Sequence, residues 1–176
     1  MSLLLLIDGY NVIAPVAPPG RVVDSSWLQR ERMQLVGRLA KHLDSGIRTR
    51  TCVVFDAANP PKDRPSQFEI DGIEVRFSVG YPAADDLLEE LIAGHSSPKQ
   101  LAVVSSDHRV QTAARRRRCA VFESQDWLDA LLDGNVRTAP WRRRGAGQGR
   151  GDDRGEDDEP TVRDDDVSQW LREFGF

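Results

Sequence analysis

The chain has 176 residues, of which 39% are hydrophobic, and a formal net charge of −4. Its length suits one domain of roughly 100–150 residues with an appendage, and no segment approaches the roughly 20 apolar residues of a membrane span. No basic residue precedes the leucine-rich start, and Asp8 interrupts it early, which argues against a secretory signal. We therefore expect a soluble, cytoplasmic protein with no membrane partner.

The chain opens with a short apolar run, residues 3–7, that ends abruptly at Asp8 and is followed by Gly9 and Asn11. A run without polar alternation is typical of a central strand in a parallel sheet that is covered on both faces. An acid at the carboxyl end of such a strand lies where open α/β sheets place their ligand sites. On this stretch alone, Asp8 is equally well explained as a hydrogen-bond acceptor in the turn.

Further along, helix-like and strand-like segments alternate. This alternation predicts an α/β fold with a mainly parallel sheet of about five strands between helices. Residues 73–79 are predicted to form an edge strand, although Asp71-Gly72 before them is also a hairpin signal. The remaining expected elements are helices over about residues 26–45, 82–95, 107–118 and 124–134, and strands over residues 51–57, 100–107 and 119–122.

The composition changes near residue 134. Residues 1–133 are predicted to form the folded domain, and residues 134–165, rich in glycine, arginine and acids, a disordered linker. Residues 166–176 place Trp170, Leu171 and Phe174 on one face of a short helix, which we expect to dock on this domain or on a protein partner.

Neither cysteine chemistry nor a nucleotide fingerprint is indicated. Cys52 and Cys119 lie in strand-like apolar runs and are predicted to be buried thiols without a disulfide. The GxGxxG and Walker patterns are absent.

Residues 1–133 carry 16 Lys and Arg against 18 Asp and Glu. If five of those acids surround a metal, the rest of the domain is net positive, so the acidic pI does not exclude nucleic acid.

Carboxylates mark the ends of several predicted elements. Asp8, Asp56 and Asp107 end strands, and Asp85 and Asp86 begin a helix that follows a strand end. In a parallel sheet these points meet at one edge, where clustered like charges raise one another's pKa unless a cation compensates. Oxygen ligands without His or Cys suit Mg²⁺ or Mn²⁺, which can activate water for attack on a phosphodiester. Individually, each acid could instead be a helix cap.

Four segments, IDGYNVI, VVFDA, AADDLLEELI and VVSSD, occur in this order. In order and spacing they resemble the YacP-like NYN domain family of PIN-like nucleases, over roughly residues 3–133. The resemblance implies a three-layer PIN-like fold and a metal-dependent endoribonuclease that acts on single-stranded or ribosome-associated RNA in bacteria. A non-catalytic RNA-binding module that retains the fold is the alternative.

The resemblance also implies roles for single residues. Asp8 and Asp85 would be the central metal-organising acids, Asp86 and Asp107 would complete the site, and Asp56 would lie further out. Asn11 would orient the metal-bound water or a phosphate. The Asp85-Asp86 pair departs from the more usual Asp-Glu and puts the second acid's role in doubt. The extension after residue 134 is not needed by the family core.

Basic and hydroxyl side chains near this edge are candidate RNA contacts. Ser105 or Ser106 could bond a carboxylate or a phosphate. The Arg115–Arg118 run ends the helix that begins at Asp107, about 15 Å from the carboxylates. These arginines are therefore expected to complement the helix dipole. The predicted basic substrate contacts, in loops or helix starts on the carboxylate side, are Arg21, Lys62, Arg64 and Arg109.

Overall fold

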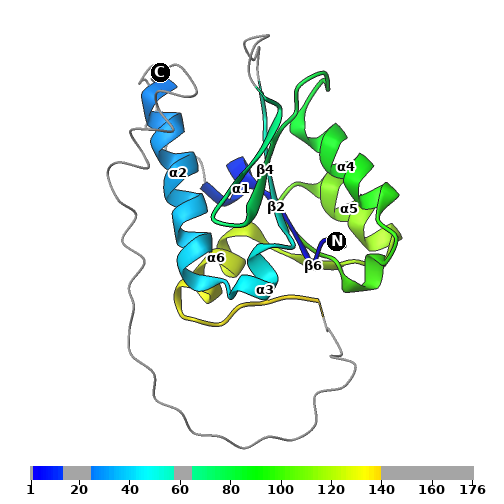
Figure 1. Ribbon diagram of the computed structural model, residues 1–176. Helices are drawn as coiled ribbons and strands as arrows, with labels where there is room; N and C mark the ends of the chain where they lie inside the picture. Colours follow the sequence, from blue (N-terminus) through cyan, green and yellow to red (C-terminus); the bar gives the residue numbers. More distant parts are fainter. Residues whose placement is uncertain (1, 14–24, 58–64, 140–176) are drawn as a thin grey trace, which may run out of the picture. The chain divides into compact units, whose positions relative to one another are not determined.

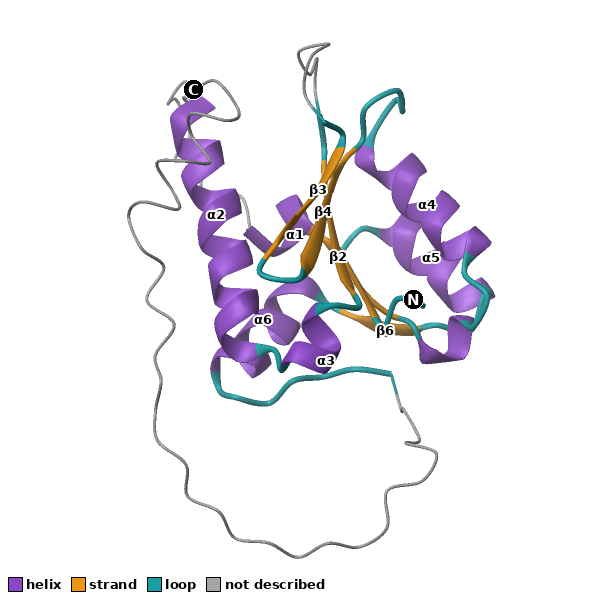
Figure 2. Cartoon of the chain, viewed as in Figure 1, coloured by secondary structure: helices purple, strands orange, loops and turns teal. Residues whose placement is uncertain are grey.

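The computed structural model describes residues 2–13, 25–57 and 65–139. These residues form a sheet of six strands, with helices on both of its faces (Figures 1 and 2). Along the sheet the order is β3-β4-β2-β1-β5-β6, and every neighbouring pair is parallel except β3 with β4. The expected α/β fold is confirmed. The strands are β1 (Leu5–Asp8), β2 (Thr51–Phe55), β3 (Gln67–Ile70), β4 (Ile73–Phe77), β5 (Ala102–Val104) and β6 (Ala120–Phe122).

Strand β1 lies in the middle of the sheet. It pairs with β2 on one side, where Asp8 is opposite Val54, and with β5 on the other, where Ile7 is opposite Val104. All four of its residues are buried, as expected for an apolar run with both faces covered. The chain therefore leaves β1 toward β2 and later returns to its other side, so the carboxyl end of β1 is a point where the strand order reverses, a common place for ligand sites.

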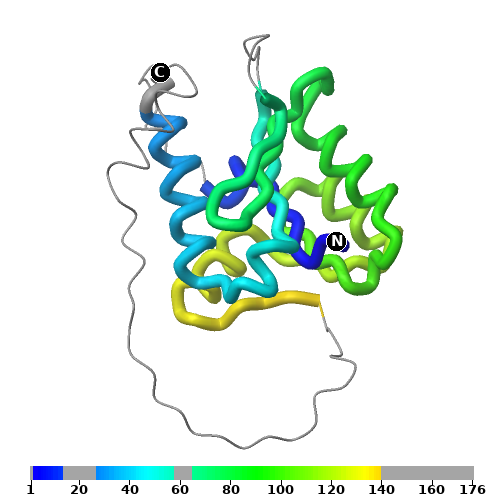
Figure 3. The backbone as a smooth tube through the Cα atoms, in the orientation of Figure 1, coloured from blue at the N-terminus to red at the C-terminus, as the bar shows by residue number. Residues whose placement is uncertain are grey.

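Helices form a layer on each face of the sheet (Figure 3). One core joins Leu5 and Ile7 to α1, α2 and α6, and the second joins Leu6 to α4 and α5. Successive strand residues point to opposite faces, which explains why neighbours in β1 enter different cores. The helices are α1 (Gly9–Ile13), α2 (Ser25–His42), α3 (Ser45–Arg48), α4 (Ala84–Gly94), α5 (His108–Arg116) and α6 (Ser124–Leu132), with a 3₁₀ turn η1 (Pro98–Gln100).

The prediction of an edge strand at residues 73–79 is wrong. Strand β4 lies inside the sheet because β3, which was not predicted, pairs with it antiparallel and takes the edge position. The hairpin signal was the correct one: Asp71 has φ of 51° and Gly72 has φ of 81°, both in the left-handed region that tight two-residue hairpins require. The hairpin also accounts for the sixth strand.

The long helix predicted for residues 26–45 ends earlier, at His42. Asp44 then caps a separate short helix, α3, by accepting a hydrogen bond from the Ile47 amide at 2.9 Å. The predicted stop residue, Gly46, lies inside α3 rather than beyond α2. None of the described helices is long and apolar enough to cross a membrane. The predicted linker and terminal helix lie outside the described residues, apart from residues 134–139, and remain predictions.

Candidate active site

The central carboxylates converge because side chains alternate along β1 and because α4 and α5 both begin at the end of that strand. Leu6 enters the core beneath α4 and α5, so Asp8, two residues on, faces the same side. Helix α4 begins there with Asp85 in its first turn, and Asp107 is the N-cap residue of α5. Three elements that are distant in the sequence therefore bring one carboxylate each to the end of β1.

Asp8 is buried, with 4% of its surface exposed, and is held in a fixed orientation. Its Oδ2 accepts hydrogen bonds from Ser105 Oγ at 2.8 Å and Asn11 Nδ2 at 2.7 Å. From the described residues, Oδ1 accepts only a long hydrogen bond, 3.4 Å, from the Asn11 amide. Burial raises the pKa of Asp8, and the Asp107 carboxylate adds to the increase, whereas the Ser105 and Asn11 bonds oppose it. The side of the carboxylate that bears Oδ1 is thus the one left for a ligand.

Ser105 is held in place by a buried glutamine that the sequence did not single out. Gln111, on α5, donates from Nε2 to the Ser105 carbonyl at 2.8 Å and to Glu123 Oε1 at 2.5 Å, and its Oε1 accepts from Arg115 at 2.9 Å. The Ser105 hydroxyl also accepts from the Asp107 amide at 3.0 Å. A polar residue on the buried stripe of α5 was the available signal, and it links the α5 helix to the orientation of Asp8.

The two adjacent acids of α4 have different surroundings. Burial raises the pKa of Asp85, and the charges of Asp107 and Asp8 raise it further. No described residue donates a hydrogen bond to its carboxylate. Asp86 instead accepts from the Ala83 amide at 3.1 Å through Oδ2 and from Arg109 at 2.6 Å through Oδ1. Asp85 is therefore the better placed of the pair to share a cation with Asp8.

Arg109 joins the starts of α5 and α4. Its guanidinium forms ion pairs of 2.6 Å with both Asp86 and Glu89. The side chain is about half exposed, so this clamp is worth little in stability, but it neutralises part of the acidic charge beside the site. A contact between Arg109 and RNA remains a prediction, and it would compete with these two carboxylates.

Asp107 and Asp56 complete the predicted set. Asp107 Oδ1 accepts from the amides of Arg109 and Val110 at 2.7 and 3.1 Å, so it caps α5 while its charge raises the pKa of the other acids. Asp56, one strand further along, accepts from Ser78 Oγ at 2.9 Å. The charge of Asp56 does not contribute to the raised pKa of Asp8 or Asp85. This agrees with the more peripheral position predicted for Asp56.

Among the described residues, no group of three His, Cys, Asp or Glu side chains is already arranged to hold a metal ion. The chemistry of the donors nevertheless suits a hard cation. Asp8, Asp85 and Asp107 offer only oxygen atoms, and the mutual increases in pKa show repulsion that a bound cation would relieve. The carboxylates are gathered, but without a closed coordination shell.

The remaining predicted contacts divide into two groups. Ser106 does not reach Asp8, because its Oγ accepts from the Ser124 amide at 3.1 Å and bonds Glu123. Three predicted basic contacts, Arg21, Lys62 and Arg64, lie outside the described residues, so their roles also stay predictions.

Comparison with known proteins agrees with this geometry. The sequence model described as the YacP-like NYN domain matches residues 5–139. The chain belongs to the YacP-like NYN family. Two crystal structures of Rae1 (YacP) from Bacillus subtilis, one of them a mutant, superpose with TM-scores of 0.54 and 0.56 at 25% identity. The matches cover 76% of this chain and 77% and 75% of the Rae1 chains. A search of curated proteins finds no match.

Membership of the YacP-like NYN family confirms the PIN-like fold expected from the sequence motifs. It also supports a nuclease-like function connected with RNA. The matched range includes each of the acids Asp8, Asp56, Asp85, Asp86 and Asp107.

Proposed function

We propose that this YacP-like NYN protein is a metal-dependent endoribonuclease. The observation that supports it most is the electrostatic coupling of Asp8, Asp85 and Asp107, which come from three separate elements of a nuclease-like fold. Like charges held together at the edge of a sheet are costly unless a cation or a proton compensates. Mg²⁺ or Mn²⁺ fits a set of oxygen donors.

In the proposed mechanism, Asp8, Asp85 and Asp107 would hold the cation. When bound, the cation would lower the pKa of a water molecule and neutralise charge on the scissile phosphate. Ser105 and Asn11 fix the Asp8 carboxylate through Oδ2, which leaves Oδ1 for the cation. Arg109 keeps Asp86 neutralised, so that the approaching phosphate meets less negative charge.

The test uses purified full-length protein and end-labelled single-stranded RNA, with EDTA, Mg²⁺ or Mn²⁺. Cleavage should require the divalent ion and should fall at least 100-fold in Asp8→Asn and in Asp85→Asn, since each removes a metal-holding charge. Asp129→Asn is the matched control, because Asp129 is exposed on α6. It should cleave like the wild-type protein.

Equal cleavage by the wild-type protein and both site variants would refute the proposal and indicate a contaminating nuclease. RNA binding without metal-dependent cleavage would favour the alternative, a non-catalytic RNA-binding module. Substrates presented free and on ribosomes would then show whether the ribosome is a partner, which the family resemblance leads us to expect.

A further inference from the structure

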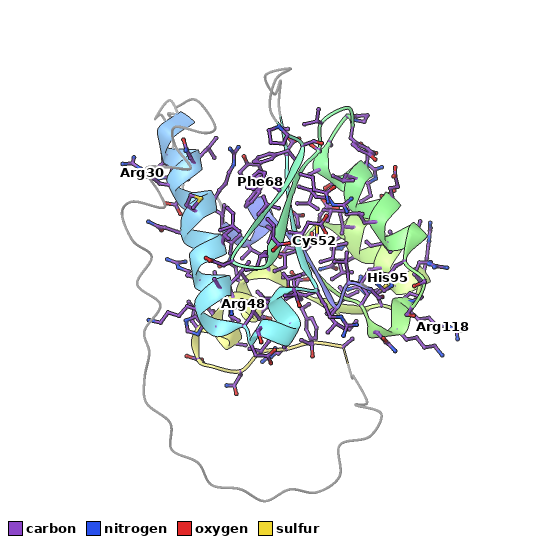
Figure 4. The ribbon with its side chains drawn as sticks, in the orientation of Figure 1. Arg30, Arg48, Cys52, Phe68, His95 and Arg118 are labelled. Atoms are coloured by element: carbon purple, nitrogen blue, oxygen red, sulfur yellow. The ribbon has the colours of Figure 1, made fainter. Side chains whose placement is uncertain are left out.

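The carboxyl-terminal end of α5 carries a concentrated positive charge that the proposed site does not use. Arg115, Arg116, Arg117 and Arg118 are all exposed, and so is Lys99 in the η1 turn. The segment that leads into the turn lies beside the helix end, since Arg117 donates to the His95 carbonyl at 2.9 Å. Figure 4 shows the labelled His95 and Arg118 on the same side of the molecule. From residue 95 to residue 122 the sequence contains a single acid, Asp107. We call these five basic residues the α5 basic surface.

Among the described residues, no acid forms an ion pair with the α5 basic surface. The charge of Arg115 acts at longer range on Glu123, whose pKa it helps to lower. Where its arginines have described hydrogen-bond partners, these are uncharged: Arg115 donates to the Gln111 side-chain oxygen and Arg117 to a backbone carbonyl. The dipole of a helix is equivalent to about half a negative charge at this end. It can balance only a small part of four adjacent guanidinium groups, so capping of the helix does not account for them.

The backbone at Arg118 gives an independent reason to look for a function of the side chain. Its φ is 61°, in the left-handed region where glycine or asparagine is favoured after a helix. The Arg118 amide donates to the Arg115 carbonyl at 2.9 Å, and the Cys119 amide to the Ala114 carbonyl at 3.0 Å. Local conformation therefore favours a residue other than arginine at this position.

The surroundings favour a phosphate backbone over a protein surface. Protein interfaces centre on apolar and aromatic side chains, but the exposed large hydrophobic residues of the described chain are Val79 and Leu132, neither of them on α5. Closely spaced, exposed guanidinium groups without apolar neighbours suit the repeated charges of a nucleic acid strand.

We propose that the α5 basic surface is a second RNA-binding surface, remote from the cleavage site, that holds a distal part of the same RNA. This proposal rests on the proposed function only in taking RNA as the substrate. Helix α5 has nine residues, which at about 1.5 Å per residue span some 14 Å from the carboxylates to this surface. Long RNA can reach both places, whereas a very short oligonucleotide occupies only one.

The test compares two double variants of the full chain that lose the same charge. Arg116→Gln with Arg118→Gly alters the α5 basic surface, and Arg30→Gln with Arg38→Gln alters exposed arginines of α2, on the other face of the sheet. Binding of labelled RNA of about 30 nucleotides is measured in EDTA, so that it does not depend on cleavage. The α5 variant should bind about tenfold more weakly and show a salt dependence reduced by about one unit of slope. The α2 variant should bind like the wild-type protein.

Two further measurements separate the possible outcomes. Thermal melting should show that Arg118→Gly alone is at least as stable as the wild-type protein, because glycine relieves the strain at φ 61°. In cleavage assays, the α5 variant should have a higher KM on long RNA, with kcat unchanged and with no effect on RNA of about six nucleotides.

Equal RNA binding by the α5 and α2 variants would overturn this inference while leaving the proposed nuclease function intact. Weaker binding by the α5 variant of a protein that never cleaves RNA would support the surface and refute the nuclease. A loss of binding to poly-glutamate alone, with RNA binding unchanged, would overturn the inference in favour of an acidic protein partner.

Discussion

Replacing Ser105 by alanine removes one hydrogen bond to the buried Asp8 carboxylate. The bond is 2.8 Å long and the serine is fully buried, so water cannot replace the lost donor. A hydrogen bond to a charged group contributes about 1.5–3 kcal/mol, and we expect Ser105→Ala to lower the free energy of unfolding by about 2 kcal/mol at pH 7. The Asp107 amide also loses its acceptor, which adds a smaller loss that does not depend on pH.

The pH dependence of this loss follows from the sign of each contribution. Burial raises the pKa of Asp8 and the Ser105 bond opposes that increase, so Ser105→Ala should raise the pKa of Asp8 further. The difference in stability between wild type and variant should be full above the pKa of folded Asp8 and should shrink as the pH falls through it, because a protonated carboxyl gains little from the bond.

Urea unfolding in EDTA, measured at pH values from about 4 to 8, tests this expectation. Ser106→Ala is the control, since Ser106 bonds the α6 start and does not reach Asp8. Its stability loss should be small and constant above about pH 5. Ser106 also bonds Glu123, whose pKa is lowered and which therefore stays ionised over that range. A Ser105→Ala loss that is equally constant would refute the view that Ser105 stabilises the ionised form of Asp8. In cleavage assays with limiting metal, the acidic limb of the pH–rate profile should move to higher pH.

Three other changes probe the same architecture. Asp85→Asn should raise the melting temperature in EDTA, because ionisation of a carboxyl whose folded pKa is raised destabilises the protein as the pH rises toward neutrality. The same change should abolish any stabilisation by Mn²⁺. A lower melting temperature in EDTA would contradict repulsion between the carboxylates. Gly9→Ala should cost about 1–3 kcal/mol, since the added Cβ would lie 2.3 Å from Phe55 Cε1; unchanged unfolding in urea would show that the ring moves freely. Burial raises the pKa of the Cys52 thiol to about 12, so iodoacetamide should not label it in the folded protein at pH 8.5, and mass spectrometry showing rapid modification would contradict its burial.

Sequence reasoning located the candidate carboxylates because the rule for parallel sheets needs little structural detail. Once Asp8, Asp56 and Asp107 are placed at strand ends, the parallel arrangement requires them to lie at one edge. The same reasoning could not separate Asp85 from Asp86. Both lie in the first turn of α4, and only the packing of α4 beside α5 pairs Asp86 with Arg109 and leaves Asp85 facing Asp8.

The hairpin shows the opposite weakness. Asp71-Gly72 was a correct local signal, but β3 before it reads as polar and irregular, with two of its four residues exposed. A strand at a sheet edge needs little apolar pattern, because one side of it has no neighbour and one face is only partly covered. Its pairing with β4 therefore depends on the neighbouring strand more than on its own residues.

By itself, the sequence of this YacP-like NYN protein determined the alternation of strands and helices, the central position of β1 and the acids at the strand ends. These follow from local apolar patterns and short-range spacing. The tertiary structure alone decided which oxygen of Asp8 is held, that Gln111 fixes Ser105, and which acid of α4 is neutralised. Each of those depends on side chains that meet across elements, at separations in the chain that no local pattern records.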